Sequence, residues 1–167
     1  MDEGQWEGLK MSAADEALTP RVDANLDPEI IALRTQLASK GHTKHLLAKT
    51  DMMTMHIHCY APKGGENDLH AHVKEDHVFV CLQGEAVFSG INGKLPALKK
   101  HQAIFIPRGC YYAFSNETQE PCILLRFGAS PEGYGSARVD TQGNPIRGRA
   151  HKEGAMAPVL IEGAFFE

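Results

Sequence analysis

The 167-residue chain lacks several features that would assign a protein to a class at once. No apolar run approaches the roughly 18 residues that a membrane-spanning helix needs, so we expect no such span. Basic residues are not in excess, because 17 Lys and Arg stand against 21 Asp and Glu for a net charge of −4, and no Lys/Arg-rich patch stands out. We therefore expect neither a nucleic-acid partner nor an anionic membrane partner.

Paired cysteines are also missing. The four cysteines are widely spaced and none forms a CxxC pair: Cys59, Cys81, Cys110 and Cys122. The opening MDEGQWEGLK is acidic and polar, unlike the basic and then apolar start of a secretory signal. We therefore expect reduced thiols in a cytoplasmic protein rather than a disulfide framework.

Residues 1–44 are predicted to form an N-terminal arm with one short helix. The first 26 residues or so show no steady period, and LDPEIIALRTQLASKG follows. Asp27 suits an N-cap, Pro28 suits the first helical position, and Gly41 can end the helix. The apolar side chains of Ile30, Leu33 and Leu37 would then lie on one face.

Residues 45–128 have the texture of short β-strands separated by turns such as PKGGEND and GING. Closely spaced strands without helices between them predict an all-β antiparallel sandwich or small barrel. Residues 129–167 are rich in glycine and proline and are predicted to be an extended C-terminal arm that packs on the barrel or on a partner subunit.

Histidine is what the chain has in excess: it contains nine, and five lie between His56 and His77. His70 and His72 are separated by one residue, so on a strand both imidazoles project from the same face. Two such imidazoles can bind one divalent metal if a third ligand joins them. Candidates follow directly in the sequence: Glu75, Asp76 and His77.

The spacing of these residues resembles the first motif of the cupin superfamily. Gly64 is followed after five residues by His70 and His72, then after four by His77 and after six by Gly84. In the family's pattern the position of His77 holds a glutamate.

A second stretch, KHQAIFIPRGCYYAFSN, resembles the second cupin motif. Pro107, Gly109 and Asn116 match the proline, the second glycine and the final asparagine of that motif. His101 stands in place of its first glycine, and Tyr112 stands in place of its histidine. The resemblance implies an antiparallel cupin barrel, also called a double-stranded β-helix or jelly roll, with a short N-terminal helix and extended terminal arms. It also implies a homodimer.

The two replacements leave the ligand set open. The resemblance implies His70, His72 and His77 as metal ligands, and an alternative register would make Asp76 the third ligand. Glu75 fits the spacing less well, so it would face solvent or orient an imidazole. Three neutral imidazoles would leave the metal's charge without a carboxylate, which favours an anionic, chelating substrate. Tyr112 would be an additional ligand, a hydrogen-bond donor beside the metal, or a packed barrel aromatic.

One divalent metal per chain is expected, with Fe(II) favoured and Zn, Ni, Mn and Cu as alternatives. The first hypothesis is a non-haem Fe(II) dioxygenase with a small chelating substrate: a hydroxylated aromatic, a dicarbonyl or a thiol. The second is a redox-neutral lyase or isomerase in which Tyr112 is the catalytic acid/base. The third is a non-catalytic cupin that binds a metal or a small ligand.

Four further residues are candidates for substrate binding. Arg126 lies in the apolar segment CILLRFG, where it would anchor a substrate carboxylate or take part in an internal ion pair. Phe79, Phe105 and Phe114 have the parity to line the barrel interior. His56 and His58 form a second HxH pair without a third ligand, so they are expected to be one face of the sheet, or a part of the cavity rim.

Overall fold

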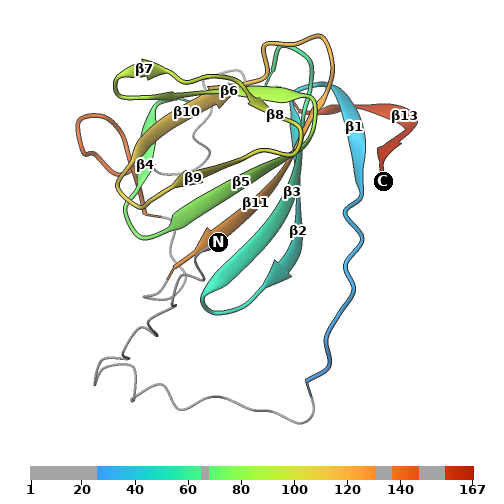
Figure 1. The fold of residues 1–167 in the computed structure, drawn as a ribbon, viewed down its shortest axis with the longest axis horizontal. Coiled ribbons are helices and arrows are strands. Elements are labelled where there is room, and N and C mark those ends of the chain that lie inside the picture. The colour runs from blue at the N-terminus through green and yellow to red at the C-terminus, as the bar shows by residue number, and fades with distance from the viewer. Residues whose placement is uncertain (1–25, 65–67, 131–136, 147–156) are drawn as a thin grey trace, which may run out of the picture. The chain divides into compact units, whose positions relative to one another are not determined.

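The computed structural model describes residues 26–64, 68–130, 137–146 and 157–167. All regular structure in these ranges is β, with thirteen strands and only antiparallel pairings (Figure 1). The predicted all-β antiparallel fold is therefore confirmed. In the part of the chain that the structure describes, no helix is long and apolar enough to cross a membrane.

One sheet has five strands. Its order is β2 (His42–Lys49), β3 (Met53–Tyr60), β11 (Cys122–Ala129), β5 (Asp76–Gln83) and β9 (Ala103–Ile106).

The second sheet packs against the first. Its order is β12 (Arg138–Val139), β4 (His70–His72), β10 (Tyr111–Ser115), β6 (Glu85–Gly90) and β7 (Gly93–Lys94), with β8 (Leu98–Lys99) also paired to β6.

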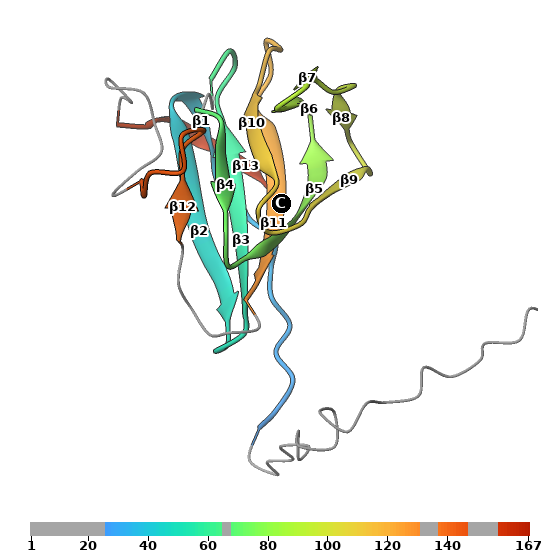
Figure 2. The same ribbon diagram turned by 90° about the vertical axis from the view of Figure 1, so that its left-hand side faces the viewer.

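The main core lies between the two sheets, whose layers Figures 1 and 2 show from two sides. Phe79 on β5 contacts Phe88 on β6 and Phe114 on β10, with ring centroids 5.5 and 5.6 Å apart. These side chains belong to one buried cluster that joins both sheets. Because neighbouring residues on a strand face opposite ways, the core fixes which residues of each strand point inward.

The helix predicted after Asp27 is not formed. Residues 26–34 have no regular structure, and β1 (Thr35–Lys40) follows as a strand that pairs with β13 (Val159–Phe166). Ala38 on β1 is fully buried in a second cluster with Ile57 and Ile123, on the outer side of β3 and β11. A single short helix gains little stability alone, so strand pairing and this burial outweigh local helix signals.

The terminal regions take part in the sheets where the structure describes them. β12 pairs with β4, so that Arg138 lies opposite His72, and β13 completes the ribbon with β1. β2 begins at His42, slightly before the predicted start of the barrel. Much of the predicted N-terminal arm, residues 1–25, lies outside the described residues.

Candidate metal centre

The candidate site is built around the short link between β4 and β5. β4 has the sequence HAH and all three residues are buried. Residues 73–75 form the link without strand structure, and β5 begins at Asp76. Since the link is not a strand, its side chains do not have to alternate between the two faces.

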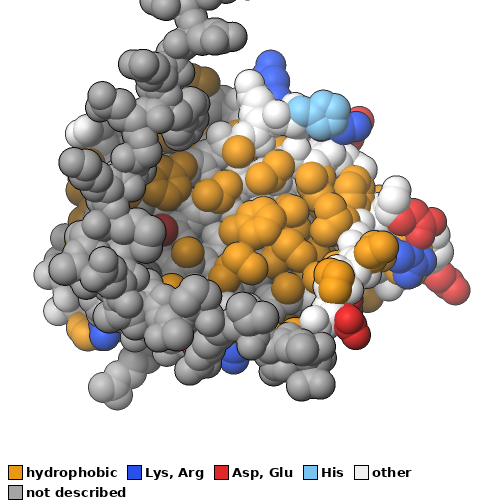
Figure 3. Space-filling view, turned by 60° about the horizontal axis from the view of Figure 1, so that its bottom comes forward, with side chains coloured by type: hydrophobic (Ala, Val, Ile, Leu, Met, Phe, Trp, Pro, Cys, Tyr) orange, Lys and Arg blue, Asp and Glu red, His pale blue; other side chains and the backbone are white. Residues whose placement is uncertain are grey.

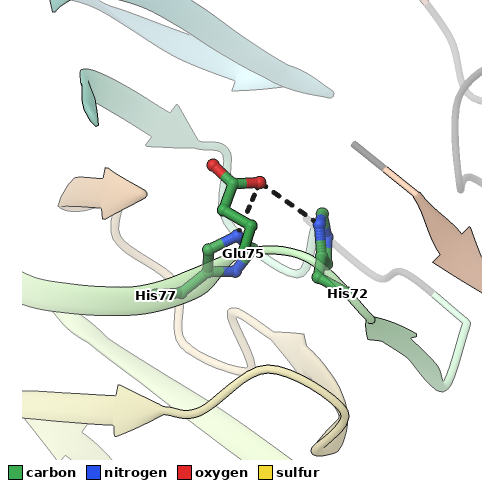
Figure 4. Close-up of side chains that lie close together, drawn as sticks. All are labelled: His72, Glu75 and His77. Carbon is green, nitrogen blue, oxygen red and sulfur yellow. Dashed lines mark ion pairs between the residues drawn. The ribbon is translucent and has the colours of Figure 1, made fainter. Parts of the chain in front are cut away.

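Three side chains of this segment converge (Figure 4). Oε2 of Glu75 lies 3.4 Å from Nδ1 of His72 and 3.0 Å from Nε2 of His77. One ligand atom from each of the three residues lies within 4.8 Å of the others. His72, Glu75 and His77 are called the ligand group below.

The expectation that this site lacks a carboxylate is wrong. Glu75 is only 8% exposed and turns inward between the two imidazoles. It can do so because Gly128, which lies opposite His77 on β11, has no side chain. A Cβ atom at Gly128 would stand 2.0 Å from Oε1 of Glu75.

Arg126 is the cation that faces Glu75. Its Nη2 lies 3.0 Å from Oε1 of Glu75 and 2.6 Å from Nε2 of His77, and the residue is 8% exposed. Of the two sequence hypotheses for Arg126, the internal ion pair is present in the structure. A role in binding a substrate carboxylate stays a prediction.

The environment keeps the ligand group in the protonation state that a metal needs. Burial would raise the pKa of Glu75, but contacts with His72 and His77 and the charge of Arg126 outweigh it and hold that pKa well below its usual range. Burial and Arg126 lower the pKa of His77 to about 4, and burial also lowers that of His72. At neutral pH the group therefore contains two neutral imidazoles and one carboxylate.

The geometry of the group fits a divalent metal. A cation about 2.1 Å from each ligand leaves neighbouring ligand atoms roughly 3.0 Å apart in octahedral and roughly 3.4 Å apart in tetrahedral coordination. Nδ1 of His72 is buried and, within the described residues, makes no hydrogen bond. An imidazole nitrogen left without a partner beside a carboxylate is suited to a metal bond.

His70 lies beside the ligand group but is not a member of it. Its Nδ1 donates to the carbonyl oxygen of Asp68 at 2.7 Å, which leaves Nε2 as an acceptor. Metal-binding histidines are commonly held in this way by a backbone carbonyl. Its ring centroid is 5.2 Å from that of His72. The predicted role of His70 as a ligand remains a prediction.

Tyr112 lies opposite His70 in the sheet and contacts His77. Its hydroxyl is 3.0 Å from Nδ1 of His77, and burial raises its pKa well above the usual range. Because Arg126 can only donate, Nε2 of His77 must accept, so the proton is on Nδ1 and is donated to Tyr112. In this arrangement Tyr112 positions the ring of His77.

Asp76, the alternative third ligand, is bound elsewhere. Its Oδ2 lies 2.8 Å from Nη2 of Arg108, and its Oδ1 accepts a hydrogen bond of 2.7 Å from the backbone nitrogen of Arg108. It follows Glu75 directly but starts β5, where the inward position belongs to His77. The structure therefore brings Glu75, and not Asp76, to the two histidines.

Of the three phenylalanines predicted to line the interior, two are buried and one is exposed. Phe79 and Phe114 are buried in the core, 2% and 6% exposed. Phe105 is 64% exposed, so the expectation for this residue is wrong. In the pairing of β5 with β9, Phe79 lies opposite Ile104, and this register turns Phe105 to the outer face.

His56 and His58 of β3 are both buried. His56 lies opposite Arg126 on β11, and burial with the nearby charges of Lys44 and Arg126 lowers the pKa of His56 to about 4. Nδ1 of His56 and Nε2 of His58 make no hydrogen bond within the described part of the chain. Nδ1 of His58 lies 3.0 Å from the hydroxyl of Tyr60.

The fold is an antiparallel two-sheet barrel, and its β4–β5 segment carries histidines and a carboxylate. The family profile of the cupin domain matches residues 56–127, which run from β3 to β11. Residues 56–127 therefore match a cupin domain, and the resemblance seen in the two motifs is confirmed for this part of the chain.

Solved structures share this fold at low identity. An uncharacterized conserved protein with a double-stranded β-helix domain from Klebsiella pneumoniae is 18% identical, with a TM-score of 0.52 over 59% of this chain and 83% of that chain. A conserved protein of unknown function from Streptococcus pyogenes is 17% identical, with a TM-score of 0.52 over 69% and 98%. An oxalate oxidase bound to the substrate analogue glycolate is 17% identical, with a TM-score of 0.50 over 61% and 56%. No curated protein matches the chain.

Proposed function

We propose that the protein is a metal-dependent enzyme that acts on a small chelating substrate, with Fe(II) as its metal and dioxygen as co-substrate. The convergence of His72, Glu75 and His77 carries this proposal. Two histidines and one carboxylate with open positions are the ligand set of non-haem Fe(II) oxygenases. When bound, Fe(II) supplies coordination positions for a chelating substrate and the electrons that activate dioxygen.

The surrounding residues support this role by positioning and charge. Tyr112 holds Nδ1 of His77, so that Nε2 is directed to the ligand group. Phe79 packs edge-on against the ring of His77, with centroids 5.9 Å apart, and closes the core side of the site. Both contacts limit rotation of the imidazole, as a preorganised metal ligand requires.

The charge around the ligand group favours an anionic substrate. Burial, followed by the positive charge of Arg126, lowers the pKa of Lys44, and the carboxylate of Glu75 opposes this shift. A divalent metal would add further positive charge. The similarity in fold to an oxalate oxidase that binds glycolate agrees with a small acid. A hydroxylated aromatic, a dicarbonyl and a thiol are the other substrate classes to test.

The redox-neutral and non-catalytic alternatives make different predictions about the metal. A lyase or isomerase with Tyr112 as acid/base would work without oxygen and with zinc or nickel. A binding protein would hold its metal or ligand without turnover. Metal identity and oxygen consumption therefore distinguish the dioxygenase, the redox-neutral enzyme and the binding protein.

The test is metal analysis of protein purified without added metal, followed by oxygen uptake on a panel of small acids, catechols, diketones and thiols. We expect about one iron per chain and oxygen uptake with one substrate class. Glu75→Gln should lower metal content at least tenfold, because it removes the charged ligand. The matched control is Asp76→Asn, which alters the neighbouring carboxylate that pairs with Arg108.

Two results would contradict the proposal. One is an absence of metal binding to the wild type even after iron is added. The other is equal metal content in Glu75→Gln and the wild type, which would remove the ligand group from the mechanism.

A further inference from the structure

Arg126 occupies a position in which its charge acts on two members of the ligand group. The same Nη2 atom is 2.6 Å from Nε2 of His77 and 3.0 Å from Oε1 of Glu75. A guanidinium has no acceptor and keeps its proton at any physiological pH, so it can only donate. The lone pair on Nε2 of His77 therefore accepts a hydrogen bond from Arg126. The same lone pair would bind a metal.

The contact between His77 and Glu75 shows why a cation is needed here. With Nε2 accepting from Arg126, the 3.0 Å approach of Nε2 to Oε2 of Glu75 brings two acceptors together. Two acceptors at this distance repel unless a positive charge stands beside both. Either the guanidinium or a metal ion can supply this charge.

We propose that Arg126 is an internal competitor of the metal ion. In the metal-free protein it neutralises Glu75 and covers Nε2 of His77, and it must release Nε2 before a metal can bind there. This inference rests on the proposed metal site. It adds that the affinity of that site is set by Arg126, so that the metal-free state is a stable state of the protein.

The arrangement of the strands offers Arg126 a second position. His56 lies directly opposite it on β3, and Nδ1 of His56 is buried without a hydrogen bond among the described residues. Cross-strand neighbours of this kind are within reach of a long side chain. Since Arg126 holds Oε1 of Glu75 while Oε2 faces the two histidines, the ion pair can persist when Nε2 is released.

The test measures the affinity of metal-free protein for Zn²⁺, which needs no substrate and no redox chemistry. Arg126→Met removes the charge and keeps an unbranched side chain, and we expect it to bind Zn²⁺ at least tenfold more tightly than the wild type. Arg126→Lys retains a cation and should stay within about threefold of the wild type. Arg108→Met is the matched control, because Arg108 pairs with Asp76 outside the ligand group, and it should leave the affinity unchanged.

Thermal unfolding provides a second readout. Metal-free Arg126→Met should melt at a lower temperature than the wild type, because Glu75 is left without its counter-ion. Zn²⁺ should raise its melting temperature by more than it raises that of the wild type, since binding stabilises the folded state in proportion to affinity.

A measurement on the wild type covers the case in which Arg126→Met does not fold. The side-chain NMR signal of Arg126, assigned by its loss in Arg126→Lys, should shift when Zn²⁺ saturates the protein. An unchanged signal, or equal or weaker Zn²⁺ binding by Arg126→Met, would overturn the competition while leaving the metal site intact. If Zn²⁺ binds neither the wild type nor Arg126→Met, the proposed metal site falls as well.

Discussion

Gly128 is the residue on which the position of Glu75 depends. A methyl group there would lie 2.0 Å from Oε1 and 2.9 Å from Cδ of Glu75, closer than non-bonded atoms approach. We expect Gly128→Ala to move Glu75 away from His72 and His77 and to cost about 1–3 kcal/mol of unfolding free energy. Metal affinity should fall at least tenfold, as measured by Zn²⁺ titration alongside urea denaturation.

Gly90→Ala is the control for this variant. A Cβ atom at Gly90 would meet the carbonyl oxygen of Tyr111 at 3.7 Å, an ordinary contact, and its φ lies outside the left-handed region. This variant should bind metal as the wild type does. Equal metal binding by Gly128→Ala would show that Glu75 does not need the space over Gly128.

Single residues were only partly predictable from the sequence. The buried positions of His72 and His77 are predictable, because motif spacing and strand parity both point them inward. Strand parity cannot place Glu75, because it lies in a link that is not a strand. Phe105 was misplaced because its parity depends on the register of β9 against β5, which no local signal defines.

At the scale of elements, Asn116 connects the end of β10 to the end of β3. Its Nδ2 lies 3.3 Å from the carbonyl oxygen of Tyr60, 3.1 Å from that of Ala61 and 2.7 Å from that of Glu120. Its Oδ1 accepts from the backbone nitrogen of Thr118 at 3.0 Å. The last residue of the second cupin motif therefore holds the β10–β11 loop against β3.

We expect Asn116→Ala to cost about 2–4 kcal/mol of unfolding free energy, because it removes the hydrogen bonds that a buried amide donates to three carbonyl oxygens. Asn92→Ala, in the exposed turn between β6 and β7, should stay within about 0.5 kcal/mol of the wild type. Chemical denaturation of both variants measures these differences in unfolding free energy. A loss below about 1 kcal/mol in Asn116→Ala would mean that the loop is held by other contacts.

The elements themselves were predictable where their pattern was strong. The short runs between the turns of residues 45–128 form strands, as predicted. The segment after Asp27 has helix-like caps, but from Thr35 it forms a strand that pairs with β13. This partner is distant in the sequence. Local propensity contains no information about such a partner.

At the scale of the whole barrel, the outer face of the five-stranded sheet is apolar. Figure 3 views the barrel from below and shows a broad group of hydrophobic side chains on that side. Phe105 is 64% exposed, and Met55, Val80 and Phe127 are partly buried at the outer side of β3, β5 and β11. We propose that this face is where two copies of the chain form the homodimer that the cupin resemblance implies.

Phe105→Lys tests this proposal. The wild type should run as a dimer in light scattering coupled to size exclusion, and Phe105→Lys should shift it towards monomer, because it places a charge in the apolar face. Ile91→Lys is the matched control, since Ile91 is 65% exposed but lies in the β6–β7 turn. A monomeric wild type, or a dimer that persists in Phe105→Lys, would contradict the assignment of this face.

The sequence by itself determined the class of fold and the concentration of histidines around the β4–β5 segment. Short strands, glycine turns and the HxH spacing are local patterns, and local patterns express backbone geometry directly. Only the tertiary structure decided that Glu75 completes the ligand group and that Arg126 neutralises it. The physical reason is that both depend on β11, which is distant in sequence: its Gly128 makes room for the carboxylate, and its pairing with β5 brings the guanidinium to His77.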